Sequence, residues 1–197
     1  MAAIGYSQGI STHSIVAQSV NNNTIEIFLG NNYIMMGNNK FAVDVMLGRV
    51  ARWLRIFGYD TLYQSKVDDD ELLFRSLLEE RILFTCDIRL AQRAGSAAYL
   101  VKTKTLWKRL REIIDRFGIE PKLCLKYCPV CNGKIIEVPK QSVSEMVPKY
   151  TFMTHEQFYR CRKCGKIYWR GSHIELAQKD ILKKVMCENN TKTDTYD

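Results

Sequence analysis

The sequence contains no apolar run approaching the roughly 20 residues that a membrane-spanning helix needs, so we expect no membrane partner. It also lacks an N-terminal basic stretch followed by an apolar core, and a secretory signal is therefore not expected. Acidic residues are in the minority, because 21 Asp and Glu stand against 29 Lys and Arg, which gives a net charge of +8. Such a balance suits a polyanionic partner such as nucleic acid, although basic charge also serves simply to solvate a surface.

Charge is almost absent from residues 1–39, where Glu26 is the only charged side chain and seven asparagines occur. Residues 24–30 and 33–37 flank an Asn-Asn pair and could form a β-hairpin. The alternative is a poorly ordered extension, which is favoured for residues 1–22. No catalytic motif is found in this part of the sequence.

Hydrophobic periodicity alternates between strand and helix spacing from residue 40 to residue 117. Strands that alternate with helices are typical of a parallel α/β sheet. The expected strands cover residues 40–44, 59–64, 81–87 and 96–101, and the expected helices cover residues 46–57, 69–80, 89–94 and 105–117.

Four of the seven cysteines form two Cys-x-x-Cys pairs in the C-terminal half. Two intervening residues let a tight turn aim both sulfurs at one ion, and zinc prefers four thiolates in a tetrahedron. A closed site of this kind stabilises a fold and does not catalyse. The 29 residues between the pairs exceed the more usual ~15–20, which implies an additional β-hairpin there. The expected ligands of a structural zinc ion are Cys128, Cys131, Cys161 and Cys164.

The remaining cysteines and the neighbouring glycines fit this interpretation. Gly133 and Gly165 suit the left-handed or closely approached turns that such pairs use. Cys86 is expected to be a small core residue, and Cys124 is a competing ligand with poorer spacing. A redox disulfide pair would need a strand–CxxC–helix context that is missing here. An odd total of seven cysteines with two Cys-x-x-Cys pairs favours metal binding in a reducing compartment, so we expect a cytoplasmic protein.

Aspartates occupy the ends of two expected strands. Asp44 and Asp87 lie at carboxyl ends, beyond which ligands bind in an open α/β sheet, and Asp69 lies in the acidic cluster 68–71 that opens the next helix. Facing carboxylates repel unless cations separate them, and hard oxygen ligands suit Mg²⁺ or Mn²⁺, which can hydrolyse phosphodiesters. The structural alternative is that these acids only cap helices and oppose helix dipoles.

Basic residues concentrate in the C-terminal half, where residues 121–185 contain thirteen Lys and Arg against five Asp and Glu. Aromatic residues interleave with them, a mixture that suits backbone contacts and base stacking on single-stranded RNA. The alternative is that the aromatic side chains form a small core. The candidate RNA-binding residues here are Arg160, Arg162, Lys163, Trp169, Arg170 and His173.

A second basic set, Arg49, Arg52 and Arg55, lies on the first expected helix. Arg49 and Arg52 are three residues apart and therefore share a face, and they closely follow Asp44. They could bind phosphate near a metal ion, or they could simply form a solvated helix face.

The segment from Lys40 reads FAVD-x-MLG-R-x-ARWLR-x-FGYDT and is followed by DDDELL and RILFTCD. Together with CPxCNGK and FYRCxxCGKxYWxGSH further on, it resembles the Mut-seven C-terminal RNase domain family, a PIN-like ribonuclease domain joined to a zinc ribbon. The resemblance covers residues 40–175. It implies a PIN-like parallel sheet with flanking helices, a C-terminal zinc ribbon, a carboxylate site for Mg²⁺ or Mn²⁺, and RNA cleavage.

The resemblance also assigns residues. Asp44, Asp69 and Asp87 match the family's acidic positions, with Asp70 and Glu71 as neighbours of the second. The family more often has arginine at the position of Cys86. PIN nucleases commonly have a fourth carboxylate near the fourth strand, and residues 96–105 contain none.

We therefore expect a metal-dependent ribonuclease whose zinc ribbon aids RNA binding. The alternatives are a non-catalytic RNA-binding adaptor that acts on ribosomal or transfer RNA, and a toxin-type PIN nuclease, so an antitoxin-like or ribosomal protein partner is conceivable. The expected units are an N-terminal extension (1–39), a nuclease domain (40–120), a zinc ribbon (121–175), and a helix with a polar tail (176–197).

Overall fold

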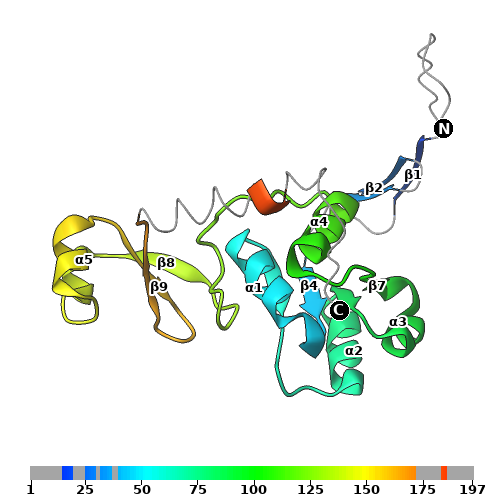
Figure 1. The fold of residues 1–197 in the computed structure, drawn as a ribbon, viewed down its shortest axis with the longest axis horizontal. Coiled ribbons are helices and arrows are strands. Elements are labelled where there is room, and N and C mark those ends of the chain that lie inside the picture. Colours follow the sequence, from blue (N-terminus) through cyan, green and yellow to red (C-terminus); the bar gives the residue numbers. More distant parts are fainter. Residues whose placement is uncertain (1–14, 20–24, 30–31, 37–39, 172–182, 186–197) are drawn as a thin grey trace, which may run out of the picture.

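A four-stranded parallel sheet forms the centre of the chain in the computed structural model (Figure 1). Its strand order is β5-β4-β6-β7, so all four strands end at the same edge. These strands are β4 (Lys40–Val43), β5 (Asp60–Leu62), β6 (Ile82–Thr85) and β7 (Ala98–Leu100). The structure describes residues 15–19, 25–29, 32–36, 40–171 and 183–185.

Helices cover both faces of this sheet and give three layers. On one face, α1 and α4 pack over Phe41, Val43 and Phe84; on the other, α2 and α3 pack over Ala42 and Leu83. The helices are α1 (Gly48–Ile56), α2 (Asp69–Leu78), α3 (Ile88–Ala94) and α4 (Leu106–Phe117), with 3₁₀ turns η1 (Val45–Leu47) before α1 and η2 (Gly95–Ala97) before β7.

Aromatic packing gives the larger core its shape. The Phe41 ring stacks on Phe84 with centroids 4.9 Å apart, and the Phe117 ring lies 5.0 Å from that of Phe84. All three side chains are buried. Each such side chain contributes about 1.5–3 kcal/mol on burial, so this cluster fixes α4 against the sheet.

A separate three-stranded antiparallel sheet precedes β4. It has the order β1-β2-β3, with β1 (Ile15–Ser19), β2 (Ile25–Leu29) and β3 (Asn32–Met36), and β3 lies beside α4. The pairing of β2 with β3 confirms the expected hairpin. The strand β1 differs from the poorly ordered extension favoured for residues 1–22, because pairing with β2 satisfies its backbone groups; the rest of that range lies outside the described residues.

The C-terminal ribbon, residues 121–171, contains a second antiparallel sheet of order β10-β9-β8. It lies beside α1, away from the other helices (Figure 1). Its elements are β8 (Ile135–Val138), η3 (Lys140–Val143), α5 (Lys149–Thr154), β9 (Phe158–Cys161) and β10 (Ile167–Trp169). The expected extra hairpin is partly right: β8 and β9 pair, but η3 and α5 connect them and pack on Phe158.

The α/β prediction is confirmed, and each expected strand and helix from residue 40 to residue 117 is present with ends shifted by a few residues. The expected C-terminal helix and polar tail (176–197) lie mostly outside the described residues, of which 183–185 are helical. Within the described residues, no helix is both long and apolar enough to cross a membrane.

Candidate functional site

Asp44 and Asp87 meet at the carboxyl edge of the parallel sheet. Asp44 directly follows β4 and is buried, with 3% of its surface exposed. The Thr85 hydroxyl, at the end of β6, donates to Asp44 Oδ2 at 2.7 Å and accepts from the Asp87 backbone N–H at 2.9 Å. Thr85 therefore joins the two aspartate residues and fixes the orientation of Asp44.

Asp87 also caps α3. Its Oδ1 accepts from the backbone N–H groups of Arg89 at 2.6 Å and Leu90 at 3.1 Å. The capping alternative is thus correct for Asp87, but both bonds use one oxygen. Asp87 is half-buried, and Oδ2 takes part in neither bond, so capping does not exclude a metal-binding role.

Asp69 lies on α2, a different element from those that carry this pair. Asp69 is exposed in the first turn of α2, and the N-cap is its neighbour Asp68, which accepts from the Glu71 backbone N–H at 2.7 Å. Asp70 forms an ion pair with Arg93 of α3. Among the described residues, only the cysteines bring three or more metal-ligand atoms within 4.8 Å of one another, so Asp44, Asp69 and Asp87 do not form such a group.

A fourth carboxylate is present near the fourth strand, where sequence reasoning found none. Glu112 of α4 accepts from the backbone N–H groups of Lys102 and Thr103, both at 3.0 Å, and from the Tyr99 hydroxyl at 3.1 Å. Burial opposes its ionisation, yet these hydrogen bonds lower the pKa of Glu112. Glu112 therefore anchors the loop after β7 as a carboxylate.

A cavity of about 760 Å³ opens between the start of α1 and the start of α4, and its lining begins at Val45, the residue after Asp44. Arg49 and Arg52 both line it, as their shared helix face predicts. Lys104 and Arg109 line it as well and were missed from the sequence. The only signal for them is a basic run just before and within the helix that begins at Leu106.

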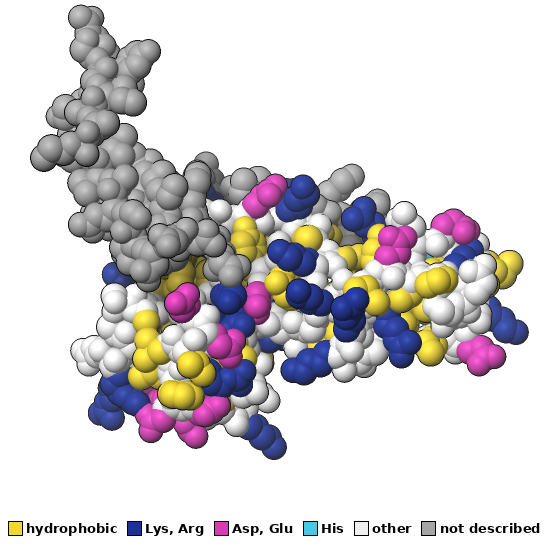
Figure 2. Space-filling view, turned by 180° about the vertical axis from the view of Figure 1, so that it is seen from behind, with side chains coloured by type: hydrophobic (Ala, Val, Ile, Leu, Met, Phe, Trp, Pro, Cys, Tyr) yellow, Lys and Arg dark blue, Asp and Glu magenta, His cyan; other side chains and the backbone are white. Residues whose placement is uncertain are grey.

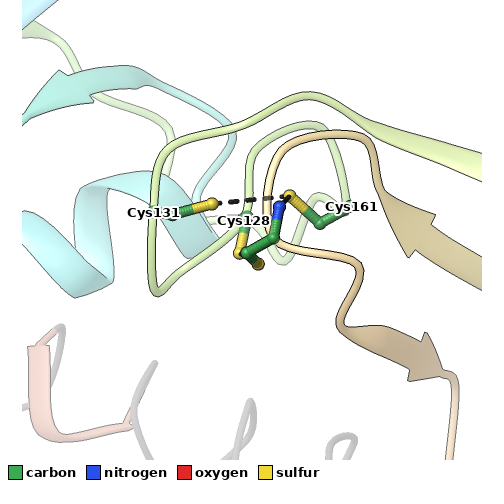
Figure 3. A group of neighbouring side chains, drawn as sticks. Cys128, Cys131 and Cys161 are labelled. Carbon is green, nitrogen blue, oxygen red and sulfur yellow. Dashed lines mark hydrogen bonds between the residues drawn. The ribbon is translucent and has the colours of Figure 1, made fainter.

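The four predicted cysteines converge in the ribbon. Cys128, Cys131 and Cys161 point toward one another from two turns (Figure 3). The Sγ atoms of Cys131 and Cys161 lie 3.5 Å apart, and those of Cys128 and Cys164 lie 3.6 Å apart. Four thiolates about 2.3 Å from one zinc ion would be about 3.8 Å apart, so the residues present fit a four-thiolate metal ion.

Backbone geometry positions these sulfurs. Cys128 N–H donates to Gly133 O at 2.9 Å, and Gly165 N–H donates to Cys161 O at 3.0 Å. A Cβ at Gly133 would lie 2.8 Å from Cys161 Sγ, and Gly165 has φ +73°. As the sequence predicts, Gly133 allows a close approach to a ligand sulfur and Gly165 adopts the left-handed conformation. Cys124 is not in the group and packs instead against Gly58.

Tyr168 supports the cluster from β10. Its hydroxyl oxygen lies 3.0 Å from Cys128 Sγ. Burial raises the pKa of the Cys128 thiol, but the hydrogen bonds from Tyr168 and from the backbone N–H groups of the turn outweigh it and lower that pKa. Groups that donate to a ligand orient it and tune the metal.

Arg55 attaches the first cysteine turn to the parallel-sheet domain. Its side chain, at the end of α1, is 3% exposed. Nη1 donates to Pro129 O at 3.2 Å and to Val130 O at 3.0 Å, both between the two cysteines, while Nε donates to Thr61 O at 2.9 Å. One buried guanidinium therefore joins α1, β5 and the metal-binding turn.

Asn132 and Asp60 complete this junction. Asn132 Oδ1 accepts from the Thr61 backbone N–H at 3.0 Å, and Asn132 Nδ2 donates to Asp60 Oδ1 at 2.6 Å. Arg81 Nη1 donates to the same Asp60 oxygen at 2.9 Å. The ribbon is thus docked on edge strand β5 through polar contacts that the sequence did not reveal.

The predicted RNA-binding residues of the ribbon divide into two groups. Trp169 is half-buried against the ribbon core and lies edge-on to the His155 ring, which agrees with the core alternative. His173 lies outside the described residues. The exposed candidates are Arg160, Arg162, Lys163 and Arg170.

In Figure 2 basic side chains form a band across the middle of the described surface, and a group of acidic side chains lies beside apolar and basic ones at the end formed by α2 and α3.

One family model, described as Mut7-C RNAse domain, matches residues 39–181. No curated protein matches the chain.

Proposed function

Because the chain belongs to the Mut7-C RNase domain family, we propose that it hydrolyses RNA phosphodiester bonds with Mg²⁺ or Mn²⁺ held by Asp44 and Asp87. The single observation that carries this proposal is the Thr85 bridge between the two aspartates at the carboxyl edge of the sheet. Substrates bind at this edge in open α/β folds.

Two carboxylates are enough for such an ion. Mg²⁺ usually keeps several waters and binds through one or two carboxylates together with substrate phosphate oxygens. The separation of Asp69 from the pair is therefore compatible with the proposal. When bound, the ion would activate a water molecule and stabilise charge on the leaving oxygen. Asp69, with Asp70 and Glu71 beside it, would act as an additional acid that faces the incoming RNA.

The chain's own residues have separable tasks in this proposal. Thr85 fixes one oxygen of Asp44, so the other oxygen keeps a constant direction. Arg49 and Arg52 neutralise phosphates next to Asp44. Glu112 holds the loop after β7 in place.

The ribbon would hold a structural zinc ion and grip RNA. The distances between its sulfurs suit zinc, and a four-thiolate site is closed to substrate. Arg160, Arg162, Lys163 and Arg170 are exposed there and would contact the RNA backbone.

A triple variant tests the site assignment. Asp44→Asn/Asp69→Asn/Asp87→Asn should lose Mg²⁺- or Mn²⁺-dependent cleavage of single-stranded RNA while it keeps its fold and zinc content. Asp115→Asn, which changes an exposed acid of α4, is the matched control and should cleave normally. Unchanged cleavage by the triple variant would refute the assignment.

A second candidate function is supported by the position of Asp69. Because the three acids are not gathered into one group, a non-catalytic RNA-binding adaptor remains the main rival. Salt-sensitive RNA binding without turnover at any Mn²⁺ concentration would favour it.

A further inference from the structure

We propose that the cavity between α1 and α4 is a subsite that holds a single-stranded RNA chain by its phosphates and unstacked bases. The proposal rests on the proposed function, since the RNA in this cavity would be the substrate that reaches Asp44. It adds Lys104, Arg109 and Trp107 to the substrate-binding residues.

The charge of the cavity points to a polyanion. Four of its lining side chains are basic, namely Arg49, Arg52, Lys104 and Arg109, and none is acidic. They come from α1, from the loop before α4 and from α4 itself, so their gathering is a product of the fold rather than of one basic helix. Arg49, Arg52 and Lys104 are exposed and free to meet phosphates.

Arg109 is held in place for this task. Its Nε donates to Thr103 O at 3.0 Å, and its side chain is half-buried. A guanidinium has five N–H donors in a fixed plane, so this bond leaves the other N–H groups in a set orientation. A positioned guanidinium loses less entropy when it binds a phosphate.

The remaining lining favours unstacked bases over a duplex. Tyr63 after β5 lines the cavity with an aromatic ring, and Met46 is 64% exposed. Trp107 in the first turn of α4 lines it as well, with its ring packed beside Trp53 and under the Lys184 ammonium. Bases of single strands stack on such surfaces, whereas bases of a duplex are already stacked on one another. The volume of about 760 Å³ is within the range of ~300–1,000 Å³ of ligand-binding clefts.

Gly48 allows the Tyr63 side chain to approach the start of α1 closely. A Cβ at this position would collide with the Tyr63 ring, and Tyr63 Oη donates to Val45 O at 3.4 Å. The Tyr63 ring thus lies close against the start of α1. Val45 lines the cavity and directly follows Asp44, so the cavity begins one residue away from the proposed metal ligand.

The test is a binding measurement without added Mg²⁺ or Mn²⁺, so that it does not depend on catalysis. The affinity of a short fluorescein-labelled single-stranded RNA is measured by anisotropy over a series of salt concentrations. The variant that alters the cavity, called the groove variant, is Arg49→Ala/Arg52→Ala/Lys104→Ala. The control is Lys66→Ala/Lys108→Ala/Lys122→Ala, which removes the same charge from exposed sites outside the cavity lining.

The groove variant should bind the RNA about tenfold more weakly or worse. The slope of log affinity against log salt concentration should become shallower by about 2, because each lost phosphate contact with a single strand removes about 0.7 from that slope. The control should stay close to the wild type. Equal losses in both variants, or an unchanged groove variant, would overturn the proposal, as would equal affinity for a duplex of the same length. All altered residues are exposed, and zinc content and melting temperature verify the folds.

The two proposals fail in different ways. If the wild type cleaves RNA and the groove variant binds and cleaves as well as the wild type, the subsite is wrong and the ribonuclease stands. If neither the wild type nor any variant cleaves RNA, but only the groove variant loses RNA binding, the subsite proposal stands and the ribonuclease proposal is wrong.

Discussion

The hydroxyl of Thr85 donates a hydrogen bond of 2.7 Å to Asp44, and both side chains are buried at the carboxyl edge of the sheet. The same oxygen accepts from the Asp87 backbone N–H. One threonine at the end of β6 therefore sets the positions of the two aspartates on which the proposed chemistry depends. The aspartates come from neighbouring strands, and no local sequence pattern links them.

Replacement of this threonine should reduce activity more than stability. Thr85→Val keeps the volume but removes the bond to Asp44, and loss of an outer partner of a metal ligand typically costs 10–100-fold in activity or metal affinity. The unpaired groups should cost about 1–3 kcal/mol of stability. Steady-state cleavage at several Mn²⁺ concentrations, with urea unfolding, measures both effects.

Thr61→Val is the matched control. Thr61 is also fully buried, and its hydroxyl donates to Tyr59 O at 3.1 Å on edge strand β5. It should lose stability without a loss of metal affinity. Equal activities of the two variants would contradict the role given to Thr85.

Loss of Arg55 should undock the ribbon. Arg55→Met keeps the apolar stem but leaves the carbonyls of Pro129 and Val130 without their donor, at a cost of about 3 kcal/mol. Urea unfolding measures the cost, and limited proteolysis between residues 118 and 127 reports undocking. Arg52→Met, on the exposed face of the same helix, should change stability by less than about 0.5 kcal/mol; a similar loss there would count against the junction.

Zinc removal should melt the ribbon before the parallel sheet. The four cysteines hold the ribbon turns, whereas the packing around Phe41 and Phe84 includes none of these four residues. Binding of such an ion supplies on the order of 10 kcal/mol of folding free energy. Elemental analysis should find one zinc per chain, and a chelator should erase the amide NMR signals of β8–β10 first. A ribbon that is unaffected by the chelator would contradict this account.

The Asp60 junction should weaken in acid. Burial opposes ionisation of Asp60, but hydrogen bonds from Arg81 and Asn132 outweigh it and lower its pKa below the ordinary value. A lowered pKa stabilises the fold above the unfolded-state pKa of about 4, and this stability is lost as the pH falls through the folded-state pKa.

The stability difference between the wild type and Asp60→Asn measures this effect. It should be constant near neutral pH and shrink below about pH 4. Both proteins keep the same four cysteines, so the difference isolates Asp60. A difference that does not change with pH would exclude the ionised Asp60 as the cause.

The sequence was sufficient to predict the features that depend on local pattern. Alternating periodicity predicted the four strands and four helices of the sheet domain, and strand-end position predicted that Asp44 and Asp87 share an edge. The spacing of the Cys-x-x-Cys pairs predicted the four sulfurs that converge. In each case a short-range rule, such as turn geometry or strand direction, decides the outcome.

The unpredicted features depend on contacts between distant residues. Arg55 looked like one more basic residue of a helix, yet it bonds to a carbonyl 75 positions away. Lys104 joins the cavity only because α4 packs beside α1, and Glu112 reaches the loop after β7 from within its helix. Trp169 matched an RNA-binding pattern, but its ring packs against the ribbon core around Phe158, which only the pairing of β9 with β10 brings beside it.

The central claim is that this chain cuts RNA with a divalent ion held by Asp44 and Asp87. The most direct test incubates the zinc-bound protein with total cellular RNA and Mn²⁺ and sequences the new RNA ends, beside an Asp44→Asn/Asp87→Asn variant of equal zinc content. The account predicts new ends with the wild type that need Mn²⁺ and are absent with the variant. The same ends from both proteins, or none from the wild type at any Mn²⁺ concentration, would contradict it.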